Sequence, residues 1–116
     1  MAGVTGIGGI FFRSKDNKAL AEWYEKHLGL SQGWQQEAGA TVFAPFKEDT
    51  GYFGNAQQQF MINLRVEGLD ELVEQLKADG VNVDDDRQDM EYGKFAWIYD
   101  PEGNKIELWE PAAENK

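Results

Sequence analysis

A lone carboxylate, Glu107, stands between two apolar residues in the most regular stretch of the sequence, GKFAWIYDPEGNKIELWEP (residues 93–111). A carboxylate in such a place can bind a divalent metal ion, act as a general base, or pair with a cationic group and orient a ligand. Its role therefore depends on the other groups that the fold brings to it.

Few other side chains offer chemistry of their own. The chain has no cysteine, which excludes disulfides, thiolate metal sites and cysteine nucleophiles. Ser14 and Ser31 lie outside any Gly-x-Ser-x-Gly nucleophile turn. The single histidine, His27, lies on the apolar stripe of a predicted helix and is expected at the edge of the core. The acidic run at residues 84–86 lacks the spacing of a calcium loop and predicts a solvated turn.

Length and charge narrow the class of protein. A chain of 116 residues predicts one domain. Its formal net charge of −10 repels nucleic-acid phosphates and anionic lipid surfaces. No apolar run approaches the ~18 residues of a membrane span, and the first residues lack the pattern of a secretory signal. We expect a cytoplasmic protein that binds neither nucleic acid nor membranes.

Glu107 lies on the second strand of a predicted hairpin. Strands are expected at residues 92–99 and 105–109, joined by Asp100-Pro101-Glu102-Gly103, whose residue types fit a type I turn.

Strand alternation then separates the side chains of residues 105–109 into two rows. If Ile106 and Leu108 pack under the helices, Glu107 and Trp109 face the opposite side of the sheet. The partner strand offers one row with Trp97 and one with Ala96, and the sequence leaves open which of them faces the same way as Glu107.

The two halves of the chain follow one plan of strand, helix and further strands. One common offset superimposes Arg13 on Arg65 and Leu20 on Leu72, which indicates an internal duplication. Helices are predicted after a start signal at residues 14–16, ending at Gly29, and around Asp70, ending at Gly80. The other strands are expected at residues 7–13, 33–37, 41–46, 59–66 and 82–84. The prediction is one α+β domain of two tandem βαβββ-type modules, at about residues 5–54 and 57–112.

The helix ending WYEKHLGL (residues 23–30) and the closing DPEGNKIELWEP (residues 100–111) resemble the glyoxalase/bleomycin-resistance/extradiol-dioxygenase superfamily, also called vicinal oxygen chelate proteins. The resemblance implies that the two modules curl into a cupped, incompletely closed mixed sheet around a pocket. It also implies a divalent metal ion held by histidine and glutamate side chains on the first and last strands of the modules, and a homodimer.

Most positions that hold the metal ion in the family have no metal-binding residue in this sequence. Glu107 matches the final glutamate, whereas Gly9, Met61 and Ala44 stand at the other positions. One carboxylate does not hold a divalent ion against water, so we expect no cofactor, with a divalent metal as the alternative. Without a metal, Glu107 needs another partner, for which the candidates are Lys105, Arg13 and Arg65.

Aromatic side chains are numerous on the strands and the connecting loop, residues 47–58, that would surround the pocket. Such walls with one buried acid suit a flat or cationic organic ligand. The predicted ligand-binding residues are Glu107, Trp109, Trp97, Phe43, Phe60, Tyr52 and Trp34.

The first hypothesis is therefore a small-molecule-binding protein without a family-type metal site. The alternative is a lyase, isomerase or dioxygenase of the same superfamily, in which Glu107 is the only candidate catalytic residue. A structural or partner-binding module is a further alternative.

Overall fold

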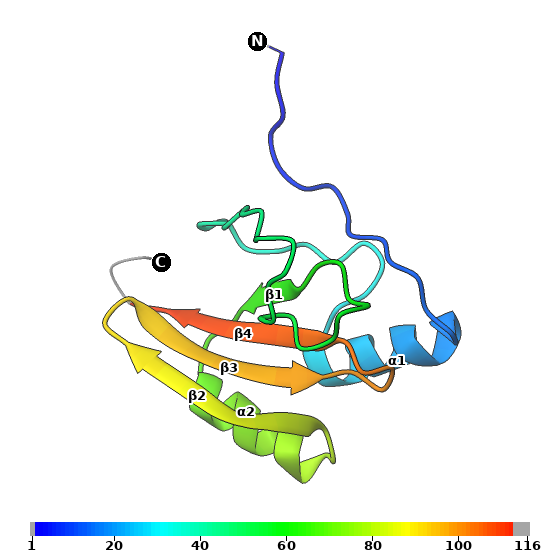
Figure 1. The fold of residues 1–116 in the computed structure, drawn as a ribbon, viewed down its shortest axis with the longest axis vertical. Helices are drawn as coiled ribbons and strands as arrows, with labels where there is room; N and C mark the ends of the chain where they lie inside the picture. The colour runs from blue at the N-terminus through cyan, green and yellow to red at the C-terminus, as the bar shows by residue number, and fades with distance from the viewer. Residues whose placement is uncertain (1, 113–116) are drawn as a thin grey trace.

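The computed structural model describes residues 2–112 and concentrates its regular structure in the second half of the chain (Figure 1). The elements are α1 (Asn17–Leu28), β1 (Ile62–Arg65), α2 (Leu69–Ala78), β2 (Asn82–Met90), β3 (Gly93–Tyr99) and β4 (Lys105–Pro111). The sheet has the order β1-β4-β3-β2, in which β1 runs parallel to β4 and the other pairs are antiparallel. The sheet is therefore mixed and open at both edges.

Both predicted helices form where the sequence signals place them. The Asp16 carboxylate caps α1 by accepting from the Ala19 amide at 3.1 Å. Gly29 ends α1 in the left-handed conformation, with φ at 72°, which glycine adopts without steric cost. Helix α2 has Asp70 and Glu71 in its first turn, where negatively charged carboxylates stabilise the helix by interacting with the positive end of its dipole. No helix among residues 2–112 has the length and apolar character to cross a membrane.

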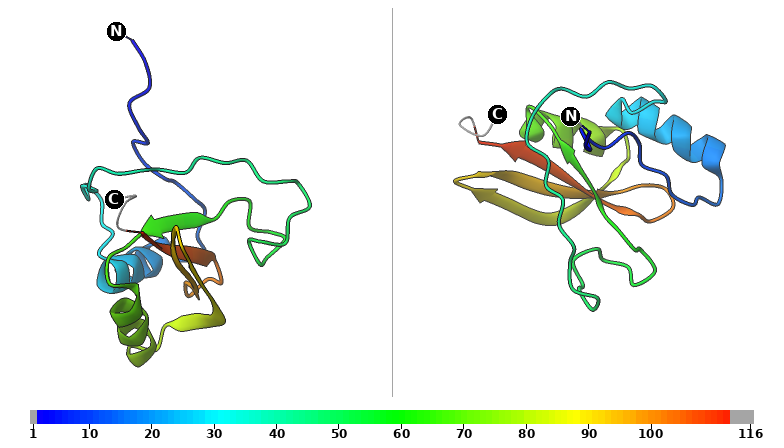
Figure 2. Two further views of the ribbon diagram at one scale, coloured as in Figure 1. Left: turned by 90° about the vertical axis from the view of Figure 1, so that its left-hand side faces the viewer. Right: turned by 90° about the horizontal axis from the view of Figure 1, so that it is seen from above.

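The core lies between the two helices and one face of the sheet (Figures 1 and 2). Ile106 and Leu108 of β4 are at most 1% exposed and join this core, as predicted. From the helices, it receives Leu20 and Tyr24 of α1 and Leu69, Val73 and Leu76 of α2. The opposite face of the sheet is thus left for Glu107.

The hairpin turn after β3 ties α1 to the sheet. The Gly103 amide donates to the Asp100 carbonyl at 2.9 Å, which closes the predicted turn. The Glu102 carboxylate accepts from Ser14 Oγ and from the amides of Lys15 and Asp16, just before α1 begins. These bonds hold the pKa of Glu102 below its ordinary value. The turn between Asp100 and Gly103 thus holds Glu102 in place, and Glu102 positions the start of α1.

The strands predicted at residues 7–13, 33–37 and 41–46 do not form, which corrects the sequence analysis. A strand needs a backbone partner, and within residues 2–112 the strand pairing is confined to β1 to β4. Between the predicted strands 33–37 and 41–46, the Arg65 guanidinium donates to the carbonyls of Glu37 and Ala40, at 2.6 Å each. The large apolar side chains left exposed in this half are Val4, Ile7, Ile10, Phe11, Phe12, Trp34, Val42, Phe43 and Phe46.

The second half follows the prediction with changes at its element ends. β1 begins at Ile62, not at residue 59. β2 runs to Met90, so residues 84–86 lie in a strand with a register shift rather than in the predicted solvated turn. The reason is that Asp84 has a partner across the strand pair, accepting from the Tyr99 hydroxyl at 2.6 Å. This bond raises the pKa of Tyr99 to about 12 and lowers the pKa of Asp84.

Candidate functional site

Glu107 occupies the middle of β4 on the face turned away from the helices. Across the sheet it is in register with Asn63 of β1 and Trp97 of β3. Its exposed fraction is only 8% although no helix covers this face. The row of β3 that contains Trp97 thus faces the same side as Glu107, which settles the register question left open by the sequence.

Three neutral groups donate hydrogen bonds to the Glu107 carboxylate. Trp97 Nε1 and the Tyr52 hydroxyl donate to Oε1, the former at 3.2 Å, and Asn63 Nδ2 donates to Oε2 at 2.5 Å. These bonds offset the cost of burying the carboxylate. Asn63 was not predicted, although its position two residues after Met61 in the predicted strand 59–66 assigns both to one face.

The predicted cationic partners of Glu107 are wrong, because each has other surroundings. Arg65 donates to backbone carbonyls of the first half, as described above. Lys105 Nζ donates to the Tyr52 carbonyl at 2.9 Å. Arg13 lines a separate pocket. The sequence could place these cations near the sheet but could not indicate where their long side chains would end.

Aromatic rings pack against the Tyr52 ring. The Tyr52 ring meets Trp97 edge-on, with centroids 6.2 Å apart and planes at 87°, and stacks on Phe46 at 5.6 Å and 25°. Lys105 Nζ lies 5.2 Å from the Tyr52 centroid and 5.6 Å from that of Trp97, within the range of cation–π attraction. Burial and, secondly, the bond to Glu107 raise the pKa of Tyr52, which remains a neutral donor at physiological pH.

The remaining predicted ligand-binding residues lie apart from this cluster. Trp109 shares the face of Glu107 but stacks on Phe95, with centroids 6.3 Å apart and planes at 5°. Its Nε1 is buried without a hydrogen-bond partner among the described residues. Phe43 and Trp34 belong to the irregular first half and are 86% and 49% exposed. The single chain therefore brings together Glu107, Trp97 and Tyr52.

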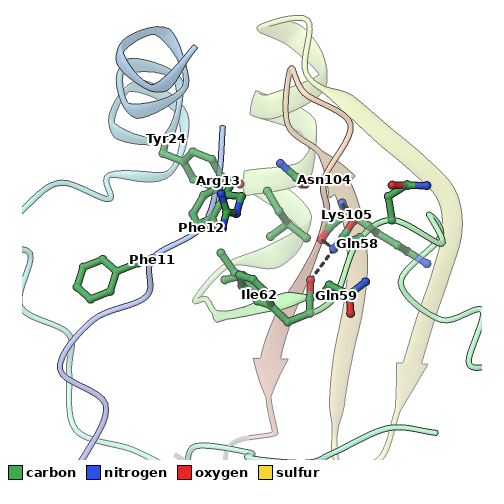
Figure 3. A pocket seen from close by; sticks show the side chains of 12 residues that line it. Phe11, Phe12, Arg13, Tyr24, Gln58, Gln59, Ile62, Asn104 and Lys105 are labelled. Carbon is green, nitrogen blue, oxygen red and sulfur yellow. Dashed lines mark hydrogen bonds between the residues drawn. The ribbon is translucent and has the colours of Figure 1, made fainter. Parts of the chain in front are cut away.

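Phe60 lines a pocket of about 340 Å³ beside the Glu107 cluster (Figure 3). Phe12 and Arg13 of the N-terminal segment and Tyr24 of α1 form one side of it, and Gln58 and Lys105 lie across from them. Because Lys105 also lies over the rings of the Glu107 cluster, the pocket and the cluster are neighbours separated by one side chain.

The residues present do not fit the family's metal ion. Within residues 2–112 no three histidine, cysteine, aspartate or glutamate side chains lie where they could share an ion. The groups pointing at Glu107 are O–H and N–H donors, and the nitrogens that Trp97 and Asn63 turn toward the carboxylate have no lone pair for a cation. Gly9, Ala44 and Met61 supply no oxygen or nitrogen side-chain ligand.

Fold and site together define a small α+β protein whose open mixed sheet carries a hydrogen-bonded carboxylate between aromatic rings. Residues 6–108 match the model of the Glyoxalase/Bleomycin resistance protein/Dioxygenase superfamily, and the chain belongs to this superfamily. The predicted family and the predicted α+β fold class with a cupped, incompletely closed sheet are thereby confirmed.

Two solved structures share the fold at low sequence identity. A member of the same superfamily from Sphaerobacter thermophilus DSM 20745 has a TM-score of 0.60 and 18% identity, over 92% of this chain and 98% of that one. TnmS3, an antibiotic binding protein from Streptomyces sp. CB03234, has a TM-score of 0.63 and 19% identity, over 97% of this chain and 100% of that one. A comparison with curated protein sequences finds no significant match.

Proposed function

We propose that this protein binds a small aromatic organic molecule at Glu107 without a metal ion of the family type. The observation that carries the proposal is the Glu107 carboxylate itself, buried among neutral donors and flanked by the rings of Tyr52 and Trp97. A buried acceptor with aromatic walls orients a flat ligand through one directed hydrogen bond and stacking. The description of TnmS3 as an antibiotic binding protein adds support by analogy of fold alone.

The test is a thermal-shift screen of neutral and cationic aromatic compounds, followed by calorimetry on the compounds that stabilise the protein. Ligand binding raises the unfolding temperature because it stabilises the folded state, by an amount that grows with the logarithm of the ligand concentration over the dissociation constant. We expect Glu107→Gln to weaken binding about tenfold or more, because a hydrogen bond to a charged acceptor is lost.

A matched control separates this effect from the general loss of one negative charge. Glu71 lies exposed on α2, on the side of the sheet away from Glu107, so Glu71→Gln changes the net charge equally and should bind like the wild type. The proposal fails if no compound stabilises the wild type, or if the Glu107→Gln and Glu71→Gln variants bind equally well.

We also propose a cytoplasmic homodimer. The exposed apolar side chains are concentrated before β1, and the outer edge of β1 has no strand partner in the described chain. Both features leave surface that a second copy would cover. Sedimentation velocity at micromolar concentration should give the mass of two chains, and a monomer at that concentration would contradict the proposal.

A further inference from the structure

The Tyr52 side chain fills the place that a ligand of Glu107 would need. Its hydroxyl donates to Oε1, its ring lies between Phe46 and Trp97, and Lys105 Nζ stands over it. Tyrosine is a phenol attached to the chain. The site is therefore observed with a phenolic group bound in it.

The segment that carries Tyr52 lies outside the sheet. Residues 47–58 consist of turns and bends, and their backbone bonds close only within the segment, as from Gly54 N to the Gly51 carbonyl at 3.1 Å. Its further hydrogen bonds to the rest of the described chain run to Lys105 and Phe60. Few buried contacts and local bonds are the features of a segment that opens without global unfolding.

The other two donors to Glu107, in contrast to Tyr52, lie on strands of the sheet. Asn63 and Trp97 belong to β1 and β3, which flank β4 in the sheet, and Trp97 is only 3% exposed. When Tyr52 leaves, these two bonds remain, and one acceptor position on Oε1 becomes available in front of Trp97.

We propose that Tyr52 is an internal stand-in for the ligand, that residues 47–58 are displaced when the ligand binds, and that the ligand is a hydroxylated aromatic molecule whose phenolic O–H donates to Glu107. This inference rests on the proposed function and names the class of ligand for the same site.

The charges at the site select this class. A ligand carboxylate would meet the negative charge of Glu107. A ligand cation in place of the Tyr52 ring would lie near the Lys105 ammonium, which stands 5.2 Å from that ring's centre. A neutral phenol avoids both repulsions, and its electron-rich ring retains the cation–π contact with Lys105.

The inference can be tested by chemical rescue with p-cresol, the free analogue of the Tyr52 side chain. Tyr52→Ala removes the phenol and should bind free p-cresol, which restores the lost ring and hydroxyl. Toluene has the same ring without the hydroxyl and should bind at least about tenfold more weakly, because the hydrogen bond to Glu107 is missing. Calorimetry and the fluorescence of the tryptophans, which include Trp97, provide the readouts. In Tyr52→Ala with Glu107→Gln, the preference for p-cresol over toluene should disappear.

Two further variants keep the test decisive. Phe53→Ala removes an aromatic ring from the same segment but leaves Tyr52, so it should not gain p-cresol binding. Tyr52→Phe keeps the ring and removes only the competing hydroxyl. It should bind phenolic compounds more tightly than the wild type does, and it tests the inference even if Tyr52→Ala does not fold.

Equal binding of p-cresol and toluene, or no p-cresol binding by a folded Tyr52→Ala variant, would overturn the inference. Preferential binding of 4-methylbenzylammonium would also overturn it, while leaving the proposed small-molecule function intact. Failure of every aromatic compound to bind the wild type and all variants would instead remove the proposed function itself.

Discussion

Two carboxylates of the last hairpin, Asp100 and Glu107, each accept a tyrosine hydroxyl, yet their surroundings differ. Asp100 accepts from Tyr24 at 2.7 Å, from the amides of Glu102 and Asn104 at 2.8 and 3.0 Å, and from the Asn104 side chain at 2.8 Å. Its tyrosine belongs to α1, packed in the core, whereas the tyrosine of Glu107 belongs to an irregular segment.

The difference shows that one pair of chemical groups can hold a fold together or leave a site open to exchange. What decides between the two is the element that carries the donor. Around Asp100 the donors among the described residues lie on the core helix, in the tight turn or directly after it, so we expect the bonds to break only on unfolding. Around Glu107 the donors among the described residues include Tyr52, which lies outside the sheet, and we expect it to leave while the sheet remains intact.

Removing the Asp100 carboxylate should have the largest effect on stability. Asp100→Ala leaves the Tyr24 hydroxyl and two backbone amides of the turn without their acceptor. We expect a loss of about 3 kcal/mol in the free energy of unfolding, since each unsatisfied buried group costs roughly 1–3 kcal/mol. Urea denaturation measures it. A loss under about 1 kcal/mol would show that the turn is not what holds α1 to the sheet.

Tyr24→Phe should have the next largest effect. It removes one buried donor to Asp100 and should cost about 1 to 2 kcal/mol. Burial and, secondly, the bond to Asp100 raise the pKa of Tyr24 well above the ordinary tyrosine value, so the hydroxyl stays a donor throughout the neutral range. The denaturation midpoint in urea should fall with an unchanged slope. An unchanged midpoint would place Tyr24 outside the structural core.

Glu102→Gln should destabilise the protein less than Tyr24→Phe and in a pH-dependent way. The amides of Lys15 and Asp16 and the hydroxyl of Ser14 hold the pKa of Glu102 below its ordinary 4.5. Its contribution is therefore present above about pH 4.5 and is lost as pH falls through the lower, folded-state pKa. Unfolding temperatures of variant and wild type should differ at pH 7 and converge at strongly acidic pH. A difference in unfolding temperature that grows on acidification would contradict a lowered pKa of Glu102 in the folded protein.

Tyr52→Phe should have the smallest effect on stability, about 0.5 kcal/mol or less. Water can take the place of its hydroxyl beside Glu107, because the segment opens locally. The same urea experiment applies, and Tyr24→Phe is its matched comparison, since both variants remove one hydroxyl bonded to a carboxylate. If both variants lose the same free energy of unfolding, Asp100 and Glu107 do not differ in the way described.

The sequence predicted the features that local signals determine. The turn after β3, the caps at Asp16 and Gly29, and the alternation that turns Glu107 away from the core all depend on residues close together in the chain. The strand predicted at residues 7–13 depends on a partner far away in sequence, which a strand-like residue pattern cannot supply. The strands predicted at residues 33–37 and 41–46 are neighbours in the chain, but the Arg65 guanidinium binds the carbonyls of Glu37 and Ala40 in their place.

The partners of Glu107 could be predicted only in part. Asn63 follows from strand alternation once Met61 is placed on the same face, and Trp97 follows once the register is known. The sequence favoured cations because an isolated carboxylate in apolar surroundings needs a partner. Tyr52 reaches Glu107 through an irregular segment whose path has no periodic signal, so its hydroxyl could not be expected there.

Native-state hydrogen exchange tests the contrast between the two carboxylates most directly. The amides of Glu102 and Asn104 donate to Asp100, and the amides of Tyr52 and Gly54 lie in the displaceable segment. We predict that the first pair exchanges only through global unfolding, and that the second pair exchanges through a local opening of much lower free energy, insensitive to low urea concentrations. Exchange of all four amides with one common free energy and urea dependence would contradict the account, because Tyr52 could then not leave Glu107 without unfolding the protein.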